Sequence, residues 1–176
     1  ISDKDFFDKL RNLGESSNNN LYILCHGSAG KLYFGDDYID TYKVLENSSL
    51  FSSLDFKNII IYACQVGQDK SFIESLELVS KSNIFYSKGL VGHEDKGGSW
   101  NLTSSLFENK KLLNNKPLNN ILPFSRSALK SWKYVLPILN ASLGAGEDGG
   151  VEKFITDNVS TSENIIVTGE LTVSQA

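Results

Sequence analysis

The sequence predicts an α/β fold with a mainly parallel sheet and helices on both of its faces. Two observations support this prediction. Short apolar runs bounded by polar residues recur at 21–25, 59–63 and 83–87, as in strands that are buried on both faces. Segments with apolar residues at helical spacing separate these runs. Strands that alternate with helices in this way are typical of a parallel sheet.

The first half of the chain contains three further predicted elements. Residues 1–13 have the apolar spacing of a helix, and Ser2 with Asp5 resembles a capping box at its start. The short apolar stretch 31–34 lies between turns of small residues, which indicates a hairpin or flap after the first buried strand. Residues 41–54 are predicted to form a helix, although an Asn-Ser-Ser stretch inside them weakens the pattern.

The second half of the chain continues the same alternation. The pattern predicts an amphipathic helix over 69–80 and a short strand over 99–102 that follows two glycines. Residues 124–139 regain an apolar pattern, in which Ser125 can cap a helix that ends before Pro137. We expect this helix to pack on the sheet and close the domain.

The character of the chain changes after this last helix. We expect a core domain over residues 1–139, a Gly-rich acidic linker over 140–150 and a β-rich tail over 151–176. The tail has β-type runs separated by turn residues, so it is interpreted as a linker strand or the start of a following domain, outside the catalytic core. Such a segment can also lie along the core as an added strand.

Two of the buried strands end in residues that can do chemistry. His26 and Gly27 follow the run at 21–25, and Cys64 follows the run at 59–63. Ligands bind outside the carboxyl ends of parallel strands, so neighbouring strands would bring the imidazole and the thiol to one edge. These groups are the parts of a cysteine nucleophile and its base. A glycine after the histidine lets a backbone N–H approach a substrate oxyanion.

A structural interpretation of these residues stands beside the catalytic one. Cysteine is among the most buried residue types, and a histidine after a strand can simply cap a turn. The pairing favours catalysis, because one histidine and one cysteine end the two most apolar runs. Cys25 precedes His26 on a strand with alternating side chains, so we expect it to be buried and inert. His93 lies in a charged, Gly-rich loop and is expected to be solvated. If Cys64 lies close to the N-terminus of the 69–80 helix, its pKa is expected to be lowered.

Three ordered blocks of the sequence resemble a known family. Residues 25–35 read CHGSAGKLYFG, residues 62–66 read YACQV and residues 97–102 read GGSWNL. The first two are similar to the His-Gly and Ala-Cys blocks of the caspase-like (clan CD) cysteine peptidases, which include caspases, gingipains, legumains, separases and toxin self-processing domains. All three resemble more closely an uncharacterised bacterial domain with SHG, YGC and GGDW blocks, which lies near the start of giant surface or secreted repeat proteins. Cys25 and Ala63 depart from that domain, where Ser and Gly are usual.

The resemblance spans about residues 5–105 and implies a caspase-like three-layer αβα sandwich. It also implies a cysteine endopeptidase in which Cys64 is the nucleophile and His26 is its base. The backbone N–H groups of Gly27 and Cys64 would then form the oxyanion hole.

A further part of the resemblance concerns substrate binding. In caspases a Ser-Trp-Arg strand lines the specificity cleft, and Ser99, Trp100 and Asn101 stand in the corresponding place. They are therefore expected to contact the substrate, with an ordinary core tryptophan as the alternative. Asn101 replaces the arginine, so the resemblance does not support an Asp-specific pocket.

Composition and motifs exclude several other classes. The net charge of −4 argues against nucleic acid or an anionic membrane as the main partner. No apolar run reaches the ~18 residues of a membrane span, and no signal peptide is visible. Zinc, calcium and phosphate-loop spacings are missing, so neither a metal nor another cofactor is expected. The expected partner is a polypeptide substrate, which can be the chain itself, and the resemblance implies a secreted or cell-surface protein.

The leading hypothesis is a cysteine endopeptidase that processes itself or cleaves a neighbouring segment of a large surface or secreted protein. The alternative is an inactive caspase-like scaffold in an adhesion or surface protein, because fold does not imply function. A third hypothesis is a hydrolase or transferase that acts on a small thioester or ester with the same dyad. Labelling with an electrophile separates the first hypothesis from the second, because a catalytic Cys64 should react well before Cys25.

Overall fold

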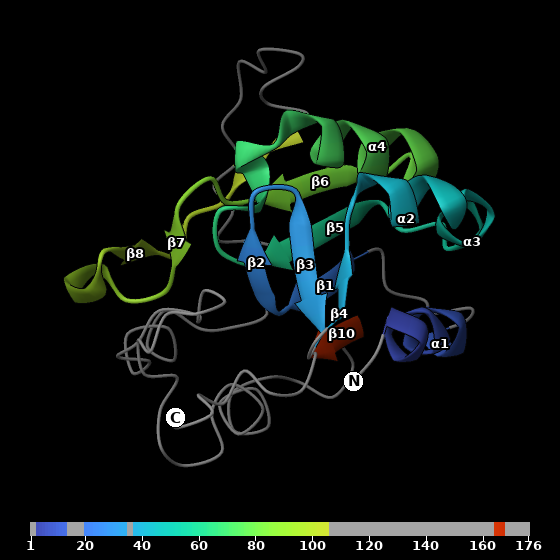
Figure 1. Cartoon of the computed structure of the whole chain (residues 1–176), viewed down its shortest axis with the longest axis horizontal. Coiled ribbons are helices and arrows are strands. Elements are labelled where there is room, and N and C mark those ends of the chain that lie inside the picture. Colours follow the sequence, from blue (N-terminus) through green and yellow to red (C-terminus); the bar gives the residue numbers. More distant parts are fainter. Residues whose placement is uncertain (1–2, 14–19, 35–36, 106–163, 168–176) are drawn as a thin grey trace.

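The computed structural model describes residues 3–13, 20–34, 37–105 and 164–167, which form a mixed α/β fold (Figure 1). In spatial order, the largest sheet contains β10 (Asn164–Val167), β1 (Asn20–Leu24), β5 (Asn58–Tyr62), β6 (Asn83–Tyr86) and β9 (Thr103–Ser104). All neighbours in it pair in parallel apart from β9, which is antiparallel to β6. The predicted α/β class with a mainly parallel sheet is confirmed.

Helices and two small sheets accompany the large sheet. The helices are α1 (Asp3–Leu13), α2 (Thr41–Glu46), α3 (Ser48–Ser53) and α4 (Lys70–Ser80), with the 3-10 turns η1 (Val66–Gln68) and η2 (Glu94–Lys96). One small sheet is antiparallel and contains β2 (His26–Ser28), β3 (Lys31–Phe34) and β4 (Asp37–Ile39). The other pairs β7 (Leu90–Val91) with β8 (Gly98–Ser99) in parallel. The predicted hairpin after the first buried strand is therefore confirmed.

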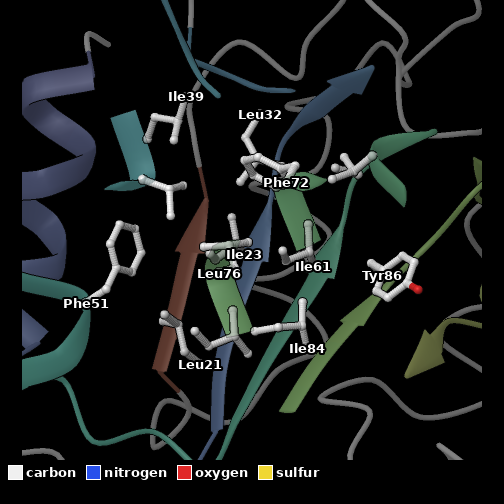
Figure 2. Packing of buried hydrophobic residues seen from close by; sticks show 14 of the residues in the cluster. Leu21, Ile23, Leu32, Ile39, Phe51, Ile61, Phe72, Leu76, Ile84 and Tyr86 are labelled. Carbon is white, nitrogen blue, oxygen red and sulfur yellow. The ribbon is translucent and has the colours of Figure 1, made fainter. Parts of the chain in front are cut away.

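The central strands are buried on both faces, as their unbroken apolar runs predict. Side chains at odd positions, such as Ile23 and Ile61, belong to the main core cluster. Tyr22 and Ile60, at even positions, are buried on the opposite face. Figure 2 shows Ile23 and Ile61 in one cluster with Leu76 of α4. Burial of each such aliphatic side chain contributes about 1.5–3 kcal/mol, so the strand ends are held on a rigid base.

The helix predicted over 41–54 is wrong in one respect, because the segment forms two short helices. Asn47 lies between α2 and α3, and its side-chain amide donates to the Lys43 carbonyl at 2.8 Å. In α3 the Ser52 hydroxyl donates to the Ser48 carbonyl at 2.9 Å. Asn and Ser side chains compete with the helical backbone for hydrogen bonds, which accounts for the break.

The later elements agree with the predictions in part. The helix predicted over 69–80 is confirmed as α4, which Asp69 caps by accepting from the Ser71 N–H at 3.0 Å. The strand predicted over 99–102 is wrong except at Ser99, which pairs with β7; residues 100–102 form no strand, and pairing with β6 begins at Thr103. The helix predicted between Ser125 and Pro137 lies outside the described residues. None of the helices in the described ranges is long and apolar enough to cross a membrane.

Four residues of the β-rich tail belong to the large sheet. β10 pairs in parallel with β1, with Asn164 opposite Leu21 and Val167 opposite Leu24. β10 lies at one edge of the sheet, next to β1, the first strand of the chain (Figure 1). The expectation that the tail lies outside the core is wrong for these residues, and the expected added strand is confirmed. β10 thus pairs with the backbone N–H and C=O groups that β1 would otherwise leave open at the edge of the sheet.

Candidate active site

Neighbouring parallel strands bring His26 and Cys64 to the same edge of the sheet. Leu24 of β1 lies opposite Tyr62 of β5. The pairing continues beyond β1, because the Cys25 N–H donates to the Tyr62 carbonyl at 3.2 Å. His26 begins β2 and Cys64 follows β5, so each lies two residues beyond the last pair of this register, Leu24 and Tyr62. Both residues therefore lie at the carboxyl edge of the parallel strands, where ligands bind in open α/β sheets.

The backbone of Gly27 lies against the backbone that carries Cys64. A Cβ atom at Gly27 would be 2.5 Å from the Cys64 carbonyl oxygen. It would also be 2.8 Å from Val66 Cγ2 and 2.9 Å from Ala63 Cβ. Only glycine allows so close an approach of the two segments. The Gly30 N–H donates to the Val66 carbonyl at 3.1 Å, which ties the turn after β2 to the loop after Cys64.

His26 is half-buried on β2 and has Tyr33 of β3 as its cross-strand neighbour. The Tyr33 and Ser28 hydroxyls form a hydrogen bond of 2.9 Å, and the Tyr38 ring lies 6.0 Å from the Tyr33 ring. The alternate residue of β3, Leu32, is buried in the core cluster. The small sheet therefore turns one face to the core and carries His26 on the face with the tyrosines.

Cys64 is a buried, neutral thiol in this structure. Its side chain is 0% exposed, and its Sγ accepts a hydrogen bond from the Val91 N–H at 3.3 Å. Burial raises the pKa of Cys64 to about 11, and the Val91 N–H opposes only part of this rise. The expected lowering of this pKa by a helix N-terminus is not seen, because η1 separates the thiol from α4, which begins at Lys70.

Cys25 lies on the other face of its strand. It is a buried member of the core cluster, so its predicted burial is confirmed. Burial raises the pKa of the Cys25 thiol far above its ordinary value, and a hydrogen bond from the Tyr33 backbone only partly opposes the rise. The expected inertness of Cys25 stays a prediction.

These buried groups predict a loss of stability at alkaline pH. With a pKa of about 11 against an ordinary 9.0, folded Cys64 keeps a proton that the unfolded chain loses. Between these two values the unfolded state binds fewer protons, so the free energy of unfolding falls with rising pH, by at most about 1.4 kcal/mol per unit. The raised pKa values of Cys25 and Tyr62 act with the same sign.

Urea unfolding at about pH 8 and about pH 10 measures this loss. We expect the Cys64→Ser variant to lose less stability than the wild type between the two conditions, because it lacks one of the raised pKa values. Equal losses in the two proteins would contradict the burial of a neutral thiol at this position.

The three predicted substrate-binding residues follow one another next to the buried thiol but have different surroundings. Ser99 pairs with Val91, whose N–H donates to that thiol. Trp100 is half-buried and packs edge-on against Tyr62, with the ring centroids 5.9 Å apart. Asn101 is exposed, and its N–H donates to Ser99 Oγ at 3.0 Å. Contact of these residues with a substrate stays a prediction.

His93 has a local structural role. Its Nδ1 accepts from the Asp95 N–H at 3.2 Å and lies 3.7 Å from the Asp95 carboxylate. His93 thus caps η2 in the loop where the sequence places it. Within the described ranges, no group of three or more His, Cys, Asp or Glu side chains is arranged to hold a metal ion.

Sequence reasoning missed the backbone groups that cover Cys64. The contact from Val91 is made by its main-chain N–H, and a main-chain donor has no signature in side-chain chemistry. The available signal is the pair of glycines, Gly89 and Gly92, on either side of the β7 dipeptide.

Comparison with known proteins gives one match. Residues 3–136 match a family described as "Domain of unknown function (DUF4347)". The matched region includes all the elements described above except β10. No curated protein and no solved structure matches the chain significantly.

Proposed function

The chain belongs to the DUF4347 family, and we propose that it is a cysteine endopeptidase with a dyad of His26 and Cys64. The observation that supports this proposal is the close approach of the two strand ends. His26 and Cys64 each lie two residues beyond the last paired residues of β1 and β5, and Gly27 packs against the Cys64 carbonyl. A base, a thiol and backbone N–H groups at one sheet edge are the components that acyl transfer requires.

The proposed mechanism assigns a role to each of these groups. His26 takes the Cys64 proton as the sulfur attacks the carbonyl carbon of the scissile peptide bond. The N–H groups of Gly27 and Cys64 stabilise the negative charge on the carbonyl oxygen. His26 then donates the proton to the leaving amine, which departs and leaves a thioester on the sulfur. Water attacks the thioester with His26 as base, and release of the carboxylate restores the thiol.

The proposal extends to fold and biological use. The parallel sheet with its helices fits a caspase-like αβα sandwich, and Ser99, Trp100 and Asn101 would lie along the substrate. Self-processing or cleavage of a neighbouring segment, in a large secreted or surface protein of a bacterium, is the proposed use. The resemblance of the sequence blocks supports this context.

Incubation of the 176-residue chain, alone and with a broad peptide library, tests the proposed function. Mass spectrometry of the products should show a specific cut within residues 140–150 or near one end of the chain, or a consistent cleavage motif in the library. Pretreatment of the protein with a thiol-alkylating reagent should remove that cleavage. An intact chain together with an uncut library would favour the scaffold.

One observation favours the scaffold as the second candidate. Cys64 is fully covered, and its pKa is raised to about 11, so the thiolate that attacks a substrate is scarce in this arrangement. In a scaffold, both residues would serve only packing. An irreversible peptidyl electrophile separates the candidates, because a peptidase should be modified on Cys64 and a scaffold should not.

A further inference from the structure

Two segments meet at Cys64, and the second of them covers it. We name residues 64–68 the Cys64 loop and residues 87–99 the arm. The arm follows β6 and contains β7, η2 and β8, which extend away from the large sheet (Figure 1). Its first residues lie along the Cys64 loop, whereas its tip is exposed.

Backbone hydrogen bonds hold the start of the arm to the loop. The Gln65 N–H donates to the Gly89 carbonyl at 2.8 Å. The Gly67 N–H donates to the Ser87 carbonyl at 2.9 Å. These bonds leave little freedom for the chain on either side of the thiol.

One side chain joins the loop to the arm, and another fixes the part of the arm whose Gly89 carbonyl binds the loop. Gln68 Nε2 donates to the Lys88 carbonyl at 3.0 Å. The Ser87 hydroxyl donates to the Gly89 carbonyl and accepts from the Gly89 N–H, both at 3.1 Å. Removal of the Gln68 and Ser87 side chains would therefore loosen the arm without changing a residue that touches Cys64.

The last contact of the arm is made with the thiol itself. The Val91 N–H donates to Cys64 Sγ at 3.3 Å, and the sulfur lies in a fully buried residue. A substrate carbonyl must come within about 3–3.5 Å of the attacking atom. In this arrangement Val91 occupies part of the space from which a substrate would approach.

The arm also has the backbone features of a segment that can move. Gly92 and Gly97 adopt positive φ angles of 137° and 79°, which glycine tolerates without strain. Residues 94–97 at the tip are exposed. Gly92 directly follows Val91, so it can absorb the backbone change that withdrawal of Val91 from the sulfur requires.

We propose that the arm is a latch that slows access to Cys64 in the resting protein, because the Val91 N–H must leave the sulfur each time a substrate reaches the thiol. This inference rests on the proposed peptidase function and adds a means of regulating it. The latch controls access to the sulfur, so it can be measured without any cleavage reaction.

The test is the rate at which iodoacetamide modifies Cys64 in the full chain, followed by peptide mapping with mass spectrometry. Val91→Pro removes the N–H that contacts the sulfur, and it should raise the rate by about tenfold or more, which corresponds to about 1.4 kcal/mol in the opening equilibrium. The double variant Gln68→Ala/Ser87→Ala should also raise the rate. If the proline variant does not fold, this double variant tests the latch in its place.

Ser52→Ala/Ser53→Ala is the matched control, because it also removes hydrogen bonds from side chains to the backbone, but on α3. It should label at the wild-type rate, and Cys25 should stay slow in every variant. Equal Cys64 rates in wild type and in the folded arm variants would overturn the latch, as would parallel labelling of Cys25. Faster labelling of Cys64 without cleavage by any variant would support the latch and reject the peptidase.

Discussion

Replacement of Cys64 by alanine should abolish cleavage of the chain and of library peptides, with a fall in rate of at least about a thousandfold. The reason is that the substitution removes the atom that forms the thioester. The structural change is small, because it removes one buried sulfur and its hydrogen bond from Val91, which contributes about 1 kcal/mol to the stability. Mass spectrometry of timed digests measures the rate, and thermal unfolding shows that the variant is folded.

His26→Ala should produce a loss of similar size, since it leaves the thiol without a base. The two residues act as a unit, so the double variant should be no slower than either single variant. Cys25→Ser should keep most of the activity, because that thiol lies in the core cluster on the other face of its strand. Cleavage that survives in Cys64→Ala, or that disappears in a folded Cys25→Ser, would show that the nucleophile is wrongly assigned.

The parts of the fold that the sequence predicts are those fixed by burial. β1, β5 and β6 coincide with apolar runs, and α4 has both an apolar face and an aspartate cap. The pairing of β10 with β1 was expected only as one option. Asn164–Val167 is one of several β-type runs in the tail, and its partner lies near the start of the chain. Local patterns do not determine such long-range pairings.

The candidate site was likewise predictable only where it depends on the buried strands. The strand ends place His26 and Cys64 at one edge of the sheet, because the register of a buried parallel pair is set by the apolar runs on both strands. The sequence did not predict that the thiol is covered, because the group that covers it is the backbone N–H of Val91. The condition for a lowered pKa is not met, because η1 separates the thiol from α4, and burial raises the pKa instead.

Gly27→Ala should destabilise the protein by about 1–3 kcal/mol, the usual effect of overpacking a closely packed contact. The added Cβ would lie 2.5 Å from the Cys64 carbonyl oxygen, so one of the two backbones must shift. Gly27 does not have a positive φ angle, so the cost is steric. For a chain of this size each 1 kcal/mol corresponds to a fall in Tm of roughly 2–4 °C. Thermal unfolding and urea unfolding both measure the effect.

Gly89→Ala is the matched control for this prediction. Gly89 also lacks a positive φ angle, and a Cβ added there would meet nothing within 4 Å. Both substitutions restrict the unfolded chain equally, so the difference between the two variants isolates the contact of Gly27 with the Cys64 backbone. The same displacement should move the strand end that carries His26 and lower cleavage activity in Gly27→Ala. If the two variants unfold at the same temperature, the segments do not pack as closely as described, and the support for the dyad is lost.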